Sequence, residues 1–184
     1  MTKPILVIGA TGPTGQHVVD KLIERSLPVR AMTRTPTKAP ARWRGIVEIV
    51  QGDLRDAHSL TQVVDTDLAA IVMCSGTRNV FGMGTNTGRE MEVGGMQNLL
   101  AALGTKTPRF AYVSTILVTR RRNNPFGILL NILRGGVLGH KLIAENQLRD
   151  SGLEYLILRP GGLSNAADRQ HQYRFDQGDR IMGQ

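Results

Sequence analysis

Three glycines spaced three residues apart, Gly9, Gly12 and Gly15, separate an apolar stretch from an amphipathic one. Gly9 would let the chain leave a buried strand in a tight turn, Gly12 would leave backbone N–H groups open to an anion, and Gly15 would let the next helix pack closely. That helix would direct the positive end of its dipole at the turn. The other residues of the turn are Thr11, Pro13 and Thr14. This spacing predicts a loop that binds the pyrophosphate of a dinucleotide.

Arg34 indicates which dinucleotide to expect. It follows the second predicted strand, about twenty residues after the glycines, where NAD-binding proteins place Asp or Glu to hold the ribose 2′-hydroxyl. No acid lies between Met32 and Pro40, and Lys38 adds a second cation. A planar guanidinium suits a phosphate monoester, which a carboxylate would repel. We therefore expect NADP(H), with NAD(H) as the less favoured cofactor and a solvated surface arginine as the alternative interpretation of Arg34.

Alternating strand and helix patterns predict the elements that position these residues. Strands are expected at 5–8, 29–33, 47–51, 69–74, 110–114 and 155–158, and helices at 14–24, 57–64, 89–103 and 139–150. Asp56 would cap the second helix, and Gly104 and Gly152 would end the third and fourth. Gly94 and Gly95 weaken the third helix unless it packs closely on a neighbour. The pattern predicts an α/β fold, a Rossmann-like doubly wound parallel sheet.

Ligands of such sheets bind beyond the carboxyl ends of the strands, so each strand end is a candidate site. Asp53 and Leu54 follow the third strand and would contact the adenine, although Asp53 could equally be a cap or turn residue. Small residues after the fourth strand would let the ribose approach the backbone. They are Cys74, Ser75 and Gly76, of which Cys74 is also interpretable as a small core residue.

The last two strand ends would lie near the nicotinamide. Ser114 ends the fifth strand and could donate a hydrogen bond to substrate or cofactor, or simply end the strand. A further segment follows the sixth strand and offers backbone N–H groups to the carboxamide. Its residues are Pro160, Gly161 and Gly162.

Composition limits the class of protein. The chain has 184 residues, of which 41% are hydrophobic, enough for one domain but too few for a Rossmann domain with a separate substrate domain. One cysteine excludes an internal disulfide and fits a reducing compartment. No Cys or His pair has metal-ligand spacing, and no apolar run approaches the roughly 18 to 20 residues that cross a bilayer. We expect a soluble, cytoplasmic protein without a metal.

The formal net charge of +8 and the run Arg120-Arg121-Arg122 leave three interpretations open. The run could be a solvated loop, could attract an anionic membrane surface or acidic protein, or could bind nucleic acid. Aromatic residues make up 4% of the chain, and no stacking pattern or helix-turn-helix signature is present. We therefore expect no nucleic-acid partner and retain a weak membrane-surface or acidic-protein contact as the second interpretation.

Five segments together resemble the atypical branch of the extended short-chain dehydrogenase/reductase superfamily, which includes NmrA-like, biliverdin/flavin reductase-like and cyanobacterial or plastid NAD(P)-binding proteins. They are 9–15, Gly52-Asp53-Leu54, Val113-Ser114-Thr115, 140–145 and 151–163. The resemblance implies catalytic roles for Ser114 and for Lys141, which would also hold the nicotinamide ribose.

The chain departs from this superfamily in two places. Orthodox members carry a proton-transferring Tyr four residues before the Lys, but that position is Val137, and Tyr112 and Tyr155 lie in strand patterns. Family members also continue with another strand and helix after a segment like 177–184. We therefore expect a domain over 1–184 that lacks its last strand and helix, as a fragment or a shortened protein, with 164–184 beginning the substrate side.

A reaction that needs no phenol fits these observations. The resemblance implies hydride transfer from NADPH to a small planar acceptor of the flavin, quinone or tetrapyrrole class, which depends mainly on stacking and orientation. The acceptor would lie among residues 79–86, 120–138 and those after Gly162. The alternative is a non-catalytic redox sensor or assembly factor that binds NADP(H).

Overall fold

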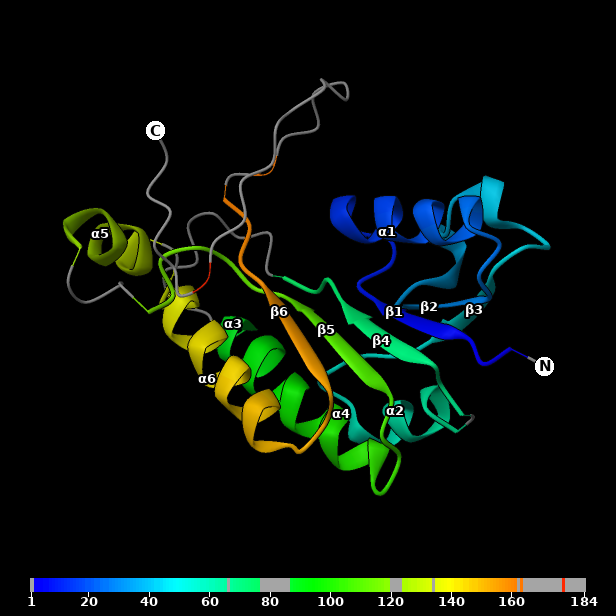
Figure 1. The fold of residues 1–184 in the computed structure, drawn as a ribbon. Coiled ribbons are helices and arrows are strands. Elements are labelled where there is room, and N and C mark those ends of the chain that lie inside the picture. The colour runs from blue at the N-terminus through cyan, green and yellow to red at the C-terminus, as the bar shows by residue number, and fades with distance from the viewer. Residues whose placement is uncertain are drawn as a thin grey trace.

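Six parallel strands form one sheet in the order β3-β2-β1-β4-β5-β6 (Figure 1). The computed structural model describes residues 2–65, 67–76, 87–119, 124–133, 135–161, 163 and 177. The strands are β1 (Ile5–Ile8), β2 (Val29–Thr33), β3 (Glu48–Gln51), β4 (Ala70–Met73), β5 (Arg109–Val113) and β6 (Tyr155–Leu158). Every predicted strand is present within one residue of its expected ends, and the Rossmann-like α/β fold is confirmed.

Helices cover both faces of the sheet (Figure 1). One face carries α1 (Pro13–Glu24), and the other carries α2 (Ala57–Val63), α4 (Gly95–Leu103) and α6 (Val137–Asp150). Two short 3-10 helices, Pro36–Lys38 and Ala41–Trp43, connect β2 to β3. The doubly wound arrangement follows from apolar residues that alternate between the two faces of the strands.

Each face of the sheet has its own core. On the α1 side, Val7 and Ala31 pack with Val19 of the helix and with Trp43. On the other side, Leu6 and Ile8 belong to a larger cluster that includes residues of α2, α4 and α6. Because β1 is buried on both faces, the glycine turn that follows it starts from a fixed position.

The predicted caps are confirmed. The Asp56 carboxylate accepts a hydrogen bond from the backbone N–H of His58 at 3.0 Å and caps α2. Gly104, with φ of +57°, ends α4, and Gly152, with φ of +76°, follows the last turn of α6.

The predicted helix over 89–103 is present, but a π-helical turn that the sequence did not predict interrupts its α-helical form. The segment consists of α3 (Thr87–Arg89), a π-helical turn (Glu90–Gly94) and α4. A Cβ atom on Gly95 would lie 2.8 Å from Cβ of Leu54, so close packing explains this glycine. A Cβ on Gly94 would meet nothing within 4 Å, so packing does not explain the other.

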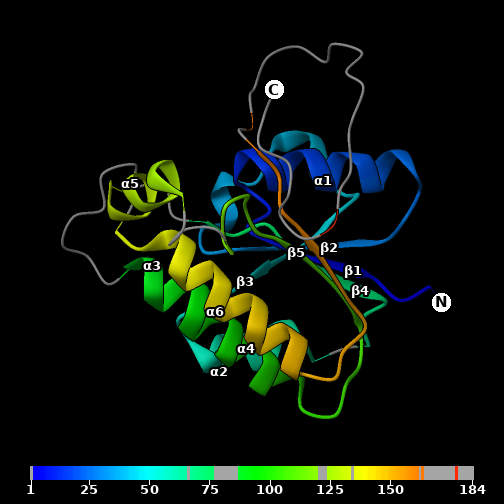
Figure 2. The same ribbon diagram turned by 60° about the vertical axis from the view of Figure 1, so that its left-hand side comes forward.

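A further helix, α5 (Pro125–Leu133), lies in a segment for which no helix was predicted. It lies at the edge of the molecule, next to the start of α6 (Figure 2). Its Pro, Gly and Asn hide the helical pattern, and the helix packs through Gly127 and Leu130 while most of its large apolar residues are exposed. The predicted substrate-side region 164–184 lies outside the described residues except for residue 177, as do 79–86.

Candidate functional site

A pocket of about 780 Å³ opens at the carboxyl ends of β1 to β4. It includes the point between β1 and β4 where the order of the strands reverses, which is where doubly wound sheets bind their ligands. Eleven of the predicted cofactor residues line it: Gly9, Thr11, Gly12, Pro13, Thr14, Arg34, Asp53, Leu54, Cys74, Ser75 and Gly76. Residues from four separate strand ends therefore meet at one place.

Close backbone contacts explain the glycines of the turn after β1. Gly9 has φ of +76°, and a Cβ atom there would lie 3.0 Å from the backbone nitrogen of Ser75. A Cβ on Gly15 would collide with the carbonyl oxygen of Gly9 and lie 2.8 Å from Cα of Ala10. Gly15 is not among the lining residues and lets α1 pack directly on the turn.

The start of α1 faces the pocket through Gly12, Pro13 and Thr14. The N–H group of Gly12 donates to the carbonyl oxygen of Gly9 at 2.9 Å. Pro13 has no N–H group, and the N–H of Gln16 donates to the carbonyl oxygen of Gly12 at 2.9 Å. The anion-binding groups of the first turn would therefore be the N–H groups of Thr14 and Gly15.

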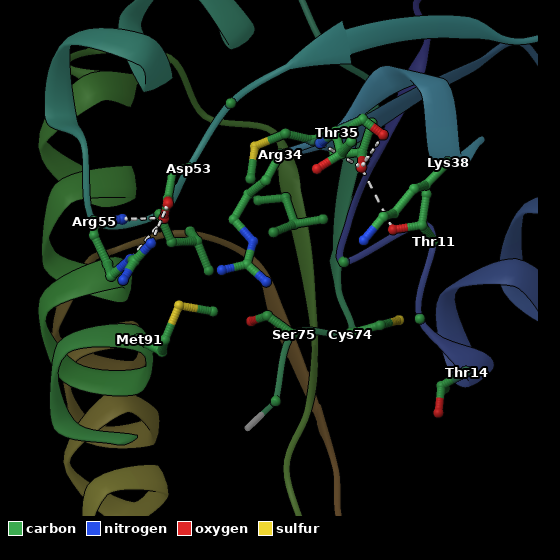
Figure 3. Close-up of a pocket in the computed structure, with 18 of the residues that line it drawn as sticks. Thr11, Thr14, Arg34, Thr35, Lys38, Asp53, Arg55, Cys74, Ser75 and Met91 are labelled. Carbon is green, nitrogen blue, oxygen red and sulfur yellow. Dashed lines mark hydrogen bonds and ion pairs between the residues drawn. The ribbon is translucent and has the colours of Figure 1, made fainter. Parts of the chain in front are cut away.

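Two cations reach the pocket from the segment after β2. Figure 3 shows the side chains of Arg34 and Lys38 pointing into it. Among the described residues, neither side chain forms an ion pair or a hydrogen bond. Thr11 and Thr33 bring their hydroxyl oxygens within 3.4 Å of each other nearby. The arrangement leaves two positive charges free to meet an anionic ligand.

Asp53 is paired with Arg55, a residue that the sequence reasoning missed. Nη2 of Arg55 donates to Oδ2 of Asp53 at 2.7 Å, and Nε and the backbone N–H of Arg55 both donate to Oδ1 (Figure 3). The side-chain hydrogen bond from Arg55 lowers the pKa of Asp53. A contact of Asp53 with adenine stays a prediction. In such a contact, the Asp53 carboxylate would bind the adenine while it also accepts the hydrogen bonds from Arg55.

Leu54 and Ser75 form the buried part of the lining. Leu54 is 2% exposed beside Gly95, and its carbonyl oxygen accepts a hydrogen bond from Nδ2 of Asn98 at 2.9 Å. Oγ of Ser75 is buried without a hydrogen-bond partner within the described part of the chain. A polar group that is buried at the edge of a pocket and lacks a partner is suited to a ligand.

Cys74 lies at the end of β4 with a mostly buried thiol. Burial raises the pKa of this thiol to about 11, although the nearby charge of Lys141 works in the opposite direction. The thiol is therefore neutral at physiological pH. Cys74 contributes a small, uncharged side chain to the pocket wall.

Lys141 does not reach the pocket. Its Nζ atom lies 3.1 Å from Oε1 of Glu92, 3.4 Å from the phenol oxygen of Tyr112 and 3.3 Å from the carbonyl oxygen of Val113. The Tyr112 hydroxyl donates to Oε2 of Glu92 at 2.6 Å, and burial together with Glu92 raises the pKa of Tyr112 well above its ordinary value. Glu92 and Tyr112 are fully buried, so Lys141 belongs to an internal cluster.

Ser114 and the end of β6 also lie outside the pocket lining. Ser114 is 5% exposed, and its backbone N–H donates to the carbonyl oxygen of Leu158 at 2.7 Å. The carbonyl oxygen of Pro160 accepts a hydrogen bond from the N–H of Ile116 at 3.1 Å. Gly161 lies beside the side chain of Ile116. Gly162 lies outside the described residues. The roles predicted for this group near a nicotinamide stay predictions.

A second buried acid joins α6 to the end of β6. The Glu145 carboxylate is fully buried and accepts hydrogen bonds from Arg159 at 2.6 Å and from Arg149 at 2.9 Å. Burial works to raise the pKa of Glu145, but the hydrogen bonds of these arginines lower it more. Arg159 therefore fixes the segment in which the residues of the sixth strand end lie.

Several lining residues had no strong signal in the sequence. Those not predicted to contact the cofactor are Ile8, Met32, Thr33, Thr35, Arg55 and Met91, whereas Lys38 was expected as a second cation and Gly52 belongs to a resembling segment. The spacing of Asp53 and Arg55, two residues apart at a strand end, is the one signal that could have indicated a paired turn. Met91 reaches the pocket from the π-helical turn, which no local pattern predicted. Among the described residues, no cluster of His, Cys, Asp or Glu could hold a metal ion.

Known proteins from plastids and algae resemble the chain in sequence. The chloroplastic protein At2g34460 of Arabidopsis thaliana is 34% identical over 172 residues, which cover 89% of this chain and 60% of the relative. The chloroplastic protein TIC 62 of Pisum sativum is 30% identical over 97% of this chain and 37% of its own. The photosystem II assembly factor Ycf39 of Cyanophora paradoxa is 28% identical over 84% of this chain and 44% of its own. The chain thus spans less than two thirds of each relative.

These relatives overturn the expectation of a cytoplasmic location. The proteins At2g34460, At2g37660 and TIC 62 from three plants are all chloroplastic, which is the finding against a cytoplasmic location. The expectation rested on one cysteine and the absence of a long apolar run, and neither feature distinguishes the cytoplasm from other reducing compartments.

The fold and the family agree with the geometry of the pocket. The oxidoreductase ylbE of Lactococcus lactis has the same fold, with a TM-score of 0.73 at 21% identity over 89% of this chain and 71% of that one. A family model described as NAD(P)H-binding matches residues 9–184, which include all the residues that line the pocket except Ile8. The chain belongs to this NAD(P)H-binding family, within the atypical short-chain dehydrogenase/reductase superfamily.

Proposed function

We propose that the protein binds NADP(H) and passes a hydride to a small planar acceptor. The observation that carries the choice of cofactor is the pair Arg34 and Lys38, which point into the pocket without an ionic partner among the described residues. No acid stands beside them at the end of β2. A free guanidinium and ammonium favour the ribose 2′-phosphate of NADP(H).

The other lining residues suit the rest of the cofactor. The first turn of α1 would receive the pyrophosphate, because the positive end of its helix dipole and the N–H group of Thr14 lie at the pocket. Leu54 and Met91 offer apolar contact to the adenine, and Asp53 with Arg55 offers polar groups at its edge. Ser75, whose buried hydroxyl has no partner among the described residues, would bond to a ribose hydroxyl.

The cluster around Lys141 bears on the chemistry. Because Glu92 and Tyr112 hold Lys141 inside the protein, this lysine is not placed to lower the pKa of a substrate-facing phenol, and Val137 stands where that phenol would be. When bound, the reduced nicotinamide would supply the hydride itself. The residues of the chain would then orient the cofactor, and a planar acceptor of the flavin, quinone or tetrapyrrole class would need stacking more than a protein acid.

A second function is supported by the same cluster. A protein that binds NADP(H) and reports its occupancy to a partner needs no proton donor, and the internal pairing of Lys141 fits that requirement. One relative is a photosystem II assembly factor, which places such a role within the range of similar proteins. This alternative is a redox sensor or assembly factor without turnover.

Oxidation of NADPH in the presence of a panel of flavins, quinones and tetrapyrroles separates the two functions. We expect turnover with at least one class of acceptor, and no turnover in Gly12→Asp, which places an anion against the pyrophosphate. Gly12→Ala is the matched control, because its Cβ would approach only the carbonyl oxygen of Gly9, at 3.2 Å. Tight binding of NADPH without reduction of any acceptor would reject the reductase and favour the sensor.

A further inference from the structure

Helix α5 exposes five large apolar side chains, none of which lines the cofactor pocket. Phe126 is 63% exposed and Ile132 is 65% exposed. Ile128, Leu129 and Leu133 are 43%, 54% and 43% exposed. A cluster of exposed apolar side chains on one short helix indicates a surface that contacts an apolar partner.

The helix is attached to the protein by its opposite side. Gly127 is buried, and Leu130 packs against the cluster of Leu117, Val137 and Leu138 at the start of α6. The side chain of Asn131 also faces inward, since its Oδ1 accepts a hydrogen bond from the N–H of Gly139 at 3.2 Å. The exposed residues therefore belong to an anchored helix, and their orientation is set by its packing.

The charge around α5 indicates what kind of surface it fits. The sequence contains no Asp or Glu between Glu92 and Glu145, but it contains seven Lys and Arg residues in that interval, of which Arg109 and Lys141 are ion-paired with Glu154 and Glu92. Four of these arginines adjoin the helix in sequence, three at 120–122 and one at position 134. Apolar side chains with flanking cations are the composition that binds the interface of an anionic bilayer.

A second copy of the chain fits this face less well. A symmetric contact through α5 would bring the same cationic segments of two molecules together, each with a net charge of +8. An anionic lipid surface instead supplies both the negative charge and the apolar layer. From the exposed apolar side chains of α5 and the positive charge of the segments that flank it in sequence, we propose that α5 is a membrane-docking helix that lies in the headgroup region of an anionic bilayer.

The helix would lie on the membrane and not across it. Nine residues extend over about 14 Å, about half of the thickness of the hydrocarbon layer. No single helix in the described ranges is long and apolar enough to cross a membrane, and α5 with α6 reaches the required composition only as a pair bent by 95°. Since α6 packs on the sheet with Ala144 and Leu148 buried, α5 alone is available to lipid.

This docking is separate from the cofactor site. No residue of α5 lines the pocket, whose lining residues end at Met91. Binding of the cofactor and docking of α5 therefore use different residues, although α5 lies within the segment 120–138 in which the acceptor is expected.

Flotation with lipid vesicles tests the proposal. The full chain is mixed with vesicles of phosphatidylcholine alone or of phosphatidylcholine and phosphatidylglycerol in equal parts. We expect binding to the anionic vesicles, little binding to the neutral ones, and a loss of at least about tenfold in the double variant Phe126→Ser/Ile132→Ser. The matched control is Ile46→Ser, which removes a side chain that is 61% exposed in the connection between β2 and β3 and should bind like the natural chain.

Three results would overturn the proposal. The first is the absence of binding to anionic vesicles, whether or not the chain forms a dimer in size-exclusion chromatography. The second is equal loss of binding in Ile46→Ser and in the double variant. The third is that the double variant binds anionic vesicles as well as the natural chain does and that high salt abolishes this binding. Such a result would mean that the arginines alone make the contact. NADPH titration of each variant checks that the pocket, and thus the fold, is intact.

Discussion

The cations that follow the carboxyl end of β2 differ from those near β5 and β6 in what they contact. Near β2, Arg34 and Lys38 reach an open pocket and have no ionic partner among the described residues. Near β5 and β6, Lys141 and Arg159 are held by the buried carboxylates of Glu92 and Glu145. A charge without a partner at a pocket is available to a ligand, whereas a buried pair is committed to the fold. The cations after β2 are therefore available to bind a ligand, whereas those near β5 and β6 hold the helices and strands in position.

The largest expected effect comes from breaking the buried cluster. Glu92→Leu should lower the free energy of unfolding by about 3–5 kcal/mol, because it leaves the ammonium of Lys141 buried without its carboxylate. Urea denaturation measures this loss. The exposed neighbour Glu90→Gln is the control and should change stability little.

A second variant checks the cause of that loss. Glu92→Leu/Lys141→Met removes both charges and should recover much of the lost stability, since an apolar pair of similar volume often replaces a buried ion pair without cost. If Glu92→Leu alone unfolds at the same urea concentration as the natural chain, the buried pair of Glu92 and Lys141 does not stabilise the fold. The contrast with the free cations after β2 would then be wrong for Lys141.

The cofactor half is tested by the free arginine. Arg34→Ala should weaken NADPH binding by about 10- to 100-fold and leave NADH binding nearly unchanged, because it removes a charge-assisted contact to the 2′-phosphate alone. Fluorescence titration measures both affinities. Arg44→Ala is the matched control, an exposed arginine outside the pocket lining. An equal loss of affinity for NADPH and NADH would show that Arg34 does not read the phosphate.

Glu145 gives the fold a dependence on pH. Its carboxyl has a pKa below the ordinary value of 4.5, because the hydrogen bonds from Arg159 and Arg149 outweigh burial, which works to raise it. A lowered pKa contributes stability that is complete above about pH 4.5 and is lost as the pH falls through the folded value. Urea denaturation at neutral pH and near pH 3 should show a loss of stability on acidification that is smaller in Glu145→Gln than in the natural chain. The same loss in both chains would leave Glu145 without this role.

The smallest effects concern two adjacent glycines next to the pocket wall. Gly94→Ala should raise the free energy of unfolding by about 0.5–1 kcal/mol, because its helical backbone has open space for a Cβ atom. Gly95→Ala should lower it by about 1–2 kcal/mol, because the added atom meets Cβ of Leu54 at 2.8 Å. Thermal unfolding compares the two, and a shift in the same direction for both would contradict the close packing at Leu54.

The parts of the fold that local sequence determines were predictable. The strands are short apolar runs, and the turn after β1 needs glycine wherever the backbone approaches Ser75 or the start of α1. The place of Arg34 followed from counting residues along one strand–helix–strand unit. These features depend on neighbours in the chain or on one crossover, which spacing encodes.

The features that the sequence did not predict depend on distant partners. Glu92 and Lys141 are 49 positions apart, and a lone Glu in a helical pattern is typical of an exposed face until β5 and α6 enclose it. The pairing of Arg55 with Asp53 depends on side-chain conformation, and the packing of α5 depends on the start of α6. Each of these is a tertiary contact that no local pattern records.

Calorimetric titration of the full chain with NADPH and with NADH tests the central claim most directly. The free cations after β2 predict that NADPH binds at least about tenfold more tightly than NADH, with an excess that declines as salt is added. Equal affinity for the two, a preference for NADH, or no heat from either at millimolar concentration would contradict it.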